Sequence, residues 1–152
     1  GENSDIAVHG SIGIVTSMFT AVYVTHDQDE ALAFYVDRLG FRVQADVRNG
    51  DYRWLTVQHP EQPVLQLGLF RPGPPVHDAA TADALHGLVA KGAMPPLVLQ
   101  GKDCRAAFEA LSTKGVEHGQ EPISRYGQVD AGLRDPSGNG WKMIERQRKE
   151  TA

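Results

Sequence analysis

The stretch "LRDPSGNGWKMIER", residues 133–146, has the composition of a strand, a tight turn and a returning strand. Its turn, DPSGNG at 135–140, combines Pro, which fixes φ, with Gly and Asn, which tolerate left-handed backbone conformations. Side chains alternate between the two faces of a strand, so Trp141 and Met143 share one face and Lys142 takes the other. We expect the apolar pair to lie on the buried face of the sheet and Lys142 on the opposite face.

The elements that precede this hairpin follow the same order twice. The first half predicts a strand at 18–26, a helix at 27–40, strands at 41–48 and 52–58 around Asn49-Gly50, and a strand at 63–70. The second half predicts a strand at 96–101, a helix at 103–115, and three strands up to 146. A shift of 76 residues places Asp27 on Asp103, and each Asp reads as a helix N-cap. Glu30 would complete a capping box with Asp27. Two consecutive βαβββ patterns predict an internal repeat.

Composition narrows the class of protein. The 152 residues carry a net charge of −4 without a basic stripe, so we expect no nucleic-acid partner. The single Cys104 excludes an internal disulfide and fits a reducing compartment. No apolar run is long enough for a membrane span, and no signal segment is recognisable, so we predict a cytoplasmic protein.

These observations predict one folded domain with short tails. We place a flexible N-terminal tail at 1–17, the domain at 18–147 and a C-terminal tail at 148–152. Within the domain, module one covers 18–70, a linker covers 71–94, and module two covers 95–147. The Ala-rich part of the linker, 79–90, has the composition of a short helix.

Three stretches resemble the vicinal oxygen chelate superfamily, which includes glyoxalase I, bleomycin-resistance proteins and extradiol dioxygenases. They are "VTHDQDEALAFYVDRLGF", "LVLQGKDCRAAFEALSTKGVEH" and "DAGLRDPSGNGWKMIE". The resemblance implies an α+β fold in which two tandem βαβββ modules form a cup-shaped, partly closed mixed sheet with helices on the outer face. It also implies that a small-molecule ligand binds inside the cup and that the chain forms a homodimer.

The resemblance also locates the metal-ligand positions of the metal-dependent members. They lie near the start of each module's first strand and on its last strand, which in this chain are Phe19, Gln66, Pro95 and Lys142. Phe and Pro offer no donor atom, and a protonated Lys repels a divalent cation. We therefore predict no metal and no other cofactor. A divalent metal held by His26, His59 or Glu145 is the alternative.

Strand alternation then gives the residues predicted to bind a ligand. Leu65, Leu67 and Leu69 would pack on helices, which turns Gln66 into the cup. By the same rule we place Val22 and Val24 toward a helix. The predicted ligand-binding residues are Phe19, Tyr23, Trp54, Gln66 and Lys142. Lys142 would hold an anionic oxygen of the ligand where other members hold a metal.

Three functions are compatible with this sequence. The leading one is a metal-free binder that holds a drug or metabolite in an aromatic-lined cup, similar to the bleomycin-resistance proteins. The second is a metal-dependent lyase, isomerase or dioxygenase of the same superfamily. The third is a metal-free enzyme with Lys142 or Tyr23 as acid or base. No catalytic residue can be assigned from sequence.

Overall fold

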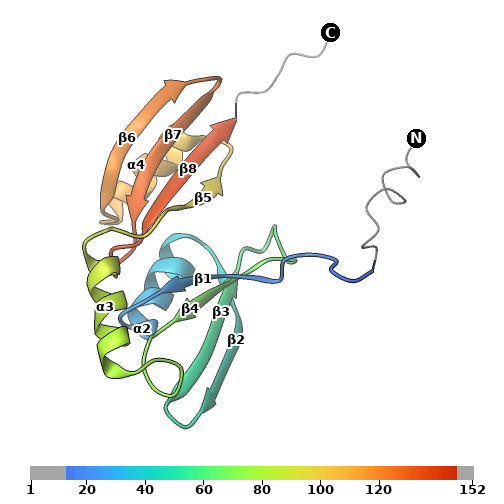
Figure 1. Ribbon diagram of the computed structural model, residues 1–152. Coiled ribbons are helices and arrows are strands. Elements are labelled where there is room, and N and C mark those ends of the chain that lie inside the picture. The colour runs from blue at the N-terminus through green and yellow to red at the C-terminus, as the bar shows by residue number, and fades with distance from the viewer. Residues whose placement is uncertain (1–12, 147–152) are drawn as a thin grey trace.

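The protein is described by a computed structural model, which covers residues 13–146 (Figure 1). Module one contains β1 (Thr20–Val24), α2 (Gln28–Leu32), the π-helix η1 (Ala33–Arg38), β2 (Arg42–Asn49), β3 (Tyr52–Gln58) and β4 (Gln66–Phe70). The linker contains α3 (Ala79–Ala90). Module two contains β5 (Leu97–Gln100), α4 (Cys104–Thr113), β6 (His118–Arg125), β7 (Gln128–Arg134) and β8 (Gly140–Arg146).

Each module forms one mixed four-stranded sheet. The strand orders are β1-β4-β3-β2 and β5-β8-β7-β6, so the same topology occurs twice. In each sheet the first strand pairs parallel with the last strand, and the remaining pairs are antiparallel. This confirms the predicted α+β class and the two tandem modules. The strand pairings described for 13–146 leave the two sheets separate, so neither sheet closes into a barrel.

The helices begin where the sequence predicts. Asp27 caps α2 by accepting a hydrogen bond from the Glu30 N–H (3.0 Å), and Asp103 caps α4 in the same way. In residues 13–146 no hydrogen bond returns from the Glu30 side chain, so only half of the predicted capping box forms. The first helix then widens into η1, in which the Leu39 N–H donates to the Phe34 carbonyl.

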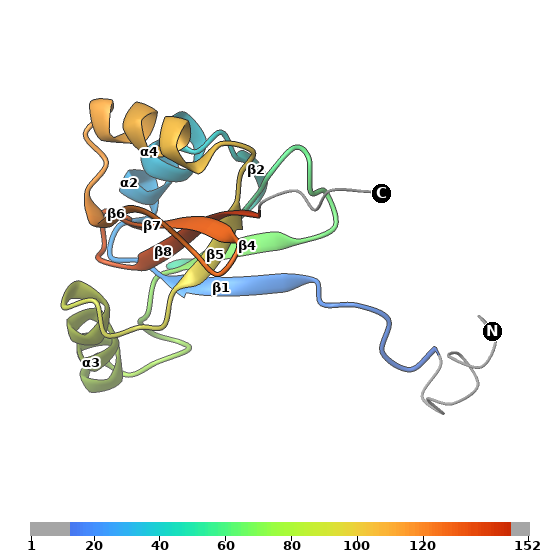
Figure 2. The same cartoon turned by 90° about the horizontal axis from the view of Figure 1, so that it is seen from above.

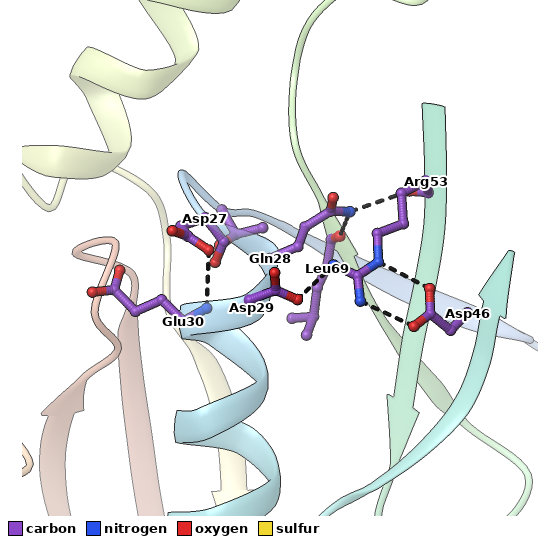
Figure 3. Close-up of polar contacts among 8 residues, drawn as sticks. Asp27, Gln28, Asp29, Glu30, Asp46, Arg53 and Leu69 are labelled. Atoms are coloured by element: carbon purple, nitrogen blue, oxygen red, sulfur yellow. Dashed lines mark hydrogen bonds and ion pairs between the residues drawn. The ribbon is translucent and has the colours of Figure 1, made fainter. Parts of the chain in front are cut away.

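Arg53 attaches the start of α2 to its sheet (Figure 3). Its guanidinium contacts the carboxylate of Asp46 through two hydrogen bonds of 2.9 Å and that of Asp29 through a third. The Gln28 amide nitrogen donates to the carbonyls of Arg53 (3.1 Å) and Leu69 (2.9 Å). The first turn of α2 is therefore bonded to β2, β3 and β4 together.

Both modules contribute to one apolar core beneath their helices. Figure 2 shows α2 and α4 side by side above the strands, and the Arg38 Nε–H donates to the Lys114 carbonyl between the two helical segments. Tyr35 and Trp141 meet edge to face within this core, with ring centroids 6.0 Å apart. The burial of Trp141 and Met143 confirms their predicted direction.

The carboxylate of Asp135 joins the hairpin to the rest of this core. Its Oδ1 accepts three backbone hydrogen bonds, from Ser137, Gly138 and Asn139, at 2.9–3.0 Å. Its Oδ2 accepts from the Tyr35 hydroxyl (2.6 Å) and from the Asn139 amide, which also donates to the Val24 carbonyl. The turn of module two is thereby bonded to the helix and first strand of module one.

The facing of β1 differs from the prediction. Tyr23 is 4% exposed and lies in the core against Trp141, whereas Val22 is 51% exposed. The hydroxyl of Tyr23 donates to the Gly140 carbonyl (2.6 Å) and accepts from the Leu97 N–H (2.6 Å). These hydrogen bonds to backbone groups of module two hold the Tyr23 ring in the core. The alternation of side chains along β1 alone could not predict them. Val22 therefore takes the place that the sequence assigned to Tyr23.

The linker confirms its short predicted helix. Asp78 caps α3 by accepting from the Thr81 N–H (2.8 Å), and Ala82 and Val89 are its buried residues. Of the helices described between residues 13 and 146, none has the length and apolar character of a membrane span. The predicted C-terminal tail, and the predicted N-terminal tail up to residue 12, lie outside the described residues.

Replacing Tyr23 by Phe tests the junction between the modules. The Tyr23→Phe change removes the acceptor of the buried Leu97 N–H and the donor to Gly140. An unsatisfied buried polar group costs about 1–3 kcal/mol, and we expect the free energy of unfolding to fall by that amount in urea titrations. Tyr126→Phe is the control, since Tyr126 is 98% exposed, and should change it by less than about 0.5 kcal/mol. Equal stabilities of the two variants would contradict the proposed junction.

Candidate ligand-binding faces

The sheet of module one has a face turned away from its helices, which we call open face one. In the register of the sheet, Thr20 pairs with Gln66, and both Val22 and Thr56 pair with Gly68, which places these side chains on the same side. A Cβ added to Gly68 would lie 3.2 Å from the Val22 Cγ2, so a glycine lets Val22 lie flat across β4. Trp54, two residues before Thr56 on β3, is half-buried on the same face.

A hydrogen-bonded pair lies at the centre of open face one. The Thr56 hydroxyl donates to the Oε1 of Gln66 over 2.8 Å, and both residues are buried. Within residues 13–146, the Nε2 of Gln66 has no hydrogen-bond acceptor. The amide oxygen is thus occupied, while the amide nitrogen can donate to a ligand beside Val22 and Trp54.

The corresponding face of module two, open face two, has a charged centre. The Lys142 Nζ lies 3.3 Å from the Asp130 Oδ1 and 3.3 Å from the Gln120 Oε1. Exposed Val98 on β5 pairs with Lys142 in the sheet. A hollow of about 160 Å³ next to Lys142 is lined by Pro96, Gly119, Gly132, Leu133, Arg134, Gly140 and Trp141. Because three of these residues are glycines, a ligand can approach the backbone there.

Asp130 determines the electrostatics of this face. Its carboxylate accepts from the Arg125 guanidinium (3.1 and 3.2 Å) and from the Gln120 amide (2.7 Å). These hydrogen bonds lower the pKa of Asp130 to about 2. The bond from Arg125 has the largest effect, that from Gln120 comes next, and that from Lys142 is smaller. Asp130 is therefore ionised near neutral pH and partly neutralises the Lys142 charge. The sequence analysis did not predict Asp130 as the partner of Lys142. The signal for it was an isolated acidic residue between Val129 and Ala131 in a predicted strand.

The structure places the predicted ligand-binding residues apart. Gln66 and Trp54 lie on open face one and Lys142 on open face two, while Tyr23 lies in the core. Phe19 precedes β1 and is 65% exposed. Gln66 and Lys142 belong to different sheets, and their predicted neighbourhood in a single cup stays a prediction.

The four positions at which the resemblance implies metal ligands do not fit a divalent cation. Phe19 and Pro95 supply no donor, the Gln66 oxygen already accepts from Thr56, and Lys142 is a cation paired with Asp130. In the described part of the chain, no group of three or more His, Cys, Asp and Glu side chains is assembled.

The alternative metal ligands have other contacts. His26 contacts His86, and His59 meets Phe41 edge to face and accepts from the Glu61 N–H. Glu145 accepts from the Cys104 N–H at the start of α4 (2.8 Å). Burial, followed by the Glu145 charge, raises the pKa of the Cys104 thiol.

Comparison with known proteins identifies the family. The Glyoxalase/Bleomycin resistance protein/Dioxygenase superfamily matches residues 17–143. The chain belongs to this superfamily. Its two open faces are thus those of a glyoxalase-like fold, in agreement with the resemblance of the DPSGN hairpin and the helix-entry stretch.

Three individual proteins match this chain over nearly their whole length. UcmS2 is 36% identical with a TM-score of 0.81, covering 86% of this chain and 98% of UcmS2. TnmS3, an antibiotic binding protein from Streptomyces sp. CB03234, is 23% identical with a TM-score of 0.69, covering 88% and 98%. The uncharacterized protein YurT of Bacillus subtilis (strain 168) is 29% identical over 134 residues, covering 88% of this chain and 98% of YurT.

The pKa of Asp130 predicts a pH dependence of stability. A carboxylate whose pKa is lower in the folded chain than its ordinary value of 3.8 stabilises the fold above about pH 4, and this contribution is lost as the pH falls toward 2. We expect Asp130→Asn to lose about 2 kcal/mol of unfolding free energy at pH 7. Between pH 5 and pH 2, the loss of stability of the variant should be smaller than that of the parent in urea titrations. Parallel pH profiles would contradict this role.

Proposed function

We propose that this protein binds a small organic molecule of the antibiotic or metabolite class on its open faces, without metal and without chemical conversion. The observation that carries the proposal is the composition of the faces, in which an exposed apolar side chain, Val22 or Val98, lies on the same face as a polar centre in each sheet. Such a mixture is typical of small-molecule sites. Superfamily membership and the similarity to the antibiotic binding protein TnmS3 support the same class of ligand.

The two faces offer different contacts to such a molecule. On open face one, the Trp54 ring and Val22 provide apolar surface, and the Gln66 amide nitrogen provides a donor beside them. On open face two, Lys142 provides an ammonium group that Asp130 holds in place and partly neutralises. Phe19, exposed before β1, adds a further aromatic surface. Tyr23 has no part in this site because its hydroxyl is used by backbone groups.

Tryptophan fluorescence can show whether a ligand binds on open face one. The chain has two tryptophans, half-exposed Trp54 and buried Trp141. In a screen of aromatic antibiotics, quinones and oxo-acids, a ligand should raise the melting temperature and quench Trp54 emission. Trp54→Phe should abolish the quenching and leave the Trp141 signal. Stabilisation without any Trp54 response would exclude open face one as the site.

Metal content separates binding from metal-dependent catalysis. Protein purified without chelator should contain well under one equivalent of zinc, nickel, manganese or iron per chain in elemental analysis. The melting temperature of the ligand complex should not change when a chelator is added. One tightly held equivalent, or loss of ligand binding after chelation, would favour the metal-dependent alternative.

Two substitutions with opposite expected effects test the charge on open face two. A charge-assisted hydrogen bond is worth about 1.5–3 kcal/mol, so Lys142→Met should weaken an anionic ligand roughly 10- to 150-fold in calorimetry. Asp130→Asn removes the neutralising carboxylate and should tighten the same ligand. Neither change should alter the affinity of a neutral ligand by more than about 3-fold. If Lys142→Met binds the anionic ligand as tightly as the parent, Lys142 is not part of the site.

We also propose that the chain forms a homodimer. Exposed apolar side chains on both faces, among them Val22 and Val98, would face a second copy with the ligand enclosed between the chains. In the described residues, β1 and β5 are edge strands with one unpaired side. The segment before β1 adds four strongly exposed apolar residues, Ile14, Val15, Met18 and Phe19. Burial of these side chains by a second copy would favour association.

The oligomeric state can be measured directly. Size-exclusion chromatography with light scattering at micromolar concentration should give about twice the chain mass of 16.6 kDa. Val22→Glu with Val98→Glu should shift the species toward the monomer, because two carboxylates would be buried without partners. A parent protein that is monomeric at this concentration would contradict the proposal.

A further inference from the structure

Two histidines from distant parts of the sequence meet beside the linker helix. The Nδ1 atoms of His26, which follows β1, and His86, on α3, lie 2.6 Å apart. Their ring centroids are 4.7 Å apart at an interplanar angle of 51°. Since ring nitrogens at this distance share one proton, one Nδ1 donates and the other accepts.

His26 lies where three parts of the chain converge. Its backbone N–H donates to the Ser137 hydroxyl of the module two hairpin (2.9 Å). Its carbonyl accepts from the Arg71 guanidinium at the start of the linker (3.1 Å). The His86 ring therefore fastens α3 to a point that is itself bonded to both modules.

The other attachments of α3 are few. Ala82 and Val89 are its buried residues, and its C-terminal carbonyls lie against Gly138, where an added Cβ would be 2.5 Å from the Val89 oxygen. Figure 2 shows α3 apart from the α2–α4 pair, outside the main helical layer. A helix with so little buried apolar surface opens locally at a small free-energy cost.

The pair tolerates one added proton and not two. The first proton can enter at Nε2 of the donor ring and leaves the Nδ1–H···Nδ1 bond intact. The second proton must enter at the accepting Nδ1, which turns both facing atoms into donors and breaks the bond. The contact is thus stable at neutral pH and becomes repulsive in acid.

Neighbouring charges act in the same direction. Burial, followed by the charges of His26 and Arg71, lowers the pKa of His86, while Asp83 one turn earlier on α3 opposes them. The hollow on the other side of His26 is lined by Lys91 and Arg134 as cations and by Glu117 and Asp135 as anions. These four charges balance, so they do not offset the repulsion between two protonated rings.

We propose that His26 and His86 form a pH-sensitive latch that holds α3 on the protein at neutral pH and releases it in mild acid. The released element is the linker helix, and the two modules remain joined through Asp135 and Tyr35. Because the His86 pKa is lower in the folded chain than its ordinary value of 6.5, the latched state is progressively disfavoured as the pH falls below about 6.5.

Hydrogen exchange of the α3 segment tests the latch. Exchange of residues 79–90 is followed by mass spectrometry at pH 7.5 and pH 5.0, with rates corrected by an unstructured peptide, and α4 serves as internal reference. A single titrating ring changes the opening equilibrium by at most about 30-fold between pH 6.5 and 5.0. We expect α3 protection to fall roughly 5- to 30-fold at pH 5.0 while α4 protection is maintained.

The helix cap does not provide an alternative explanation for such a result. The Thr81 N–H holds the pKa of Asp78 below its usual range, so this carboxylate stays ionised at pH 5.0. The cap of α3 is therefore intact at both pH values, and acid loosening of the helix has to originate elsewhere.

Three variants complete the experiment. His86→Gln and His26→Gln should each lower α3 protection at pH 7.5 and remove its extra pH dependence. His118→Gln, an exposed site on β6, should behave like the parent. If α3 protection shows no selective loss in acid, or if the loss persists in both latch variants, the proposal is overturned. Both latch substitutions leave the backbone bonds of His26 in place, so the core readout at α4 verifies folding.

Discussion

The carboxylate of Asp135 is the group on which the relative position of the two modules depends. Its five hydrogen bonds fix the hairpin turn on one side and the Tyr35 hydroxyl on the other. The carboxylate is 5% exposed, so water does not compete strongly for these bonds. The turn therefore also connects the two modules. The carboxylate that fixes the backbone of the loop accepts a hydrogen bond from Tyr35, in the helical segment of module one.

This connection has a consequence for where function is located. Because the helical sides of both modules are packed together around Tyr35 and Trp141, the sheets turn their remaining faces outward. The polar centres at Gln66 and Lys142 therefore lie on the outward faces of two different sheets. Rigid packing on one side of each sheet holds the accessible side in a defined shape, which suits a binder that has to be pre-organised.

The sequence was sufficient for the fold and insufficient for the details of the site. Repeated order, helix caps and the DPSGN turn are local signals, and they predicted the two modules, α3 and the inward direction of Trp141. The facing of Tyr23 depended on bonds to Leu97 and Gly140, more than 70 residues away. The Asp130 partner of Lys142 and the His86 partner of His26 likewise arise from contacts that no local pattern encodes.

The repeat is a symmetry of the backbone and not of its surface chemistry. A shift of 76 residues takes Gln66 to Lys142, so equivalent positions hold a neutral amide in one module and a cation in the other. The partners differ too, with a hydroxyl from Thr56 on one sheet and a carboxylate from Asp130 on the other. A molecule contacting both surfaces would meet two unlike halves and would have one preferred orientation. On the proposed function, the divergence of these equivalent positions would give ligand recognition a direction.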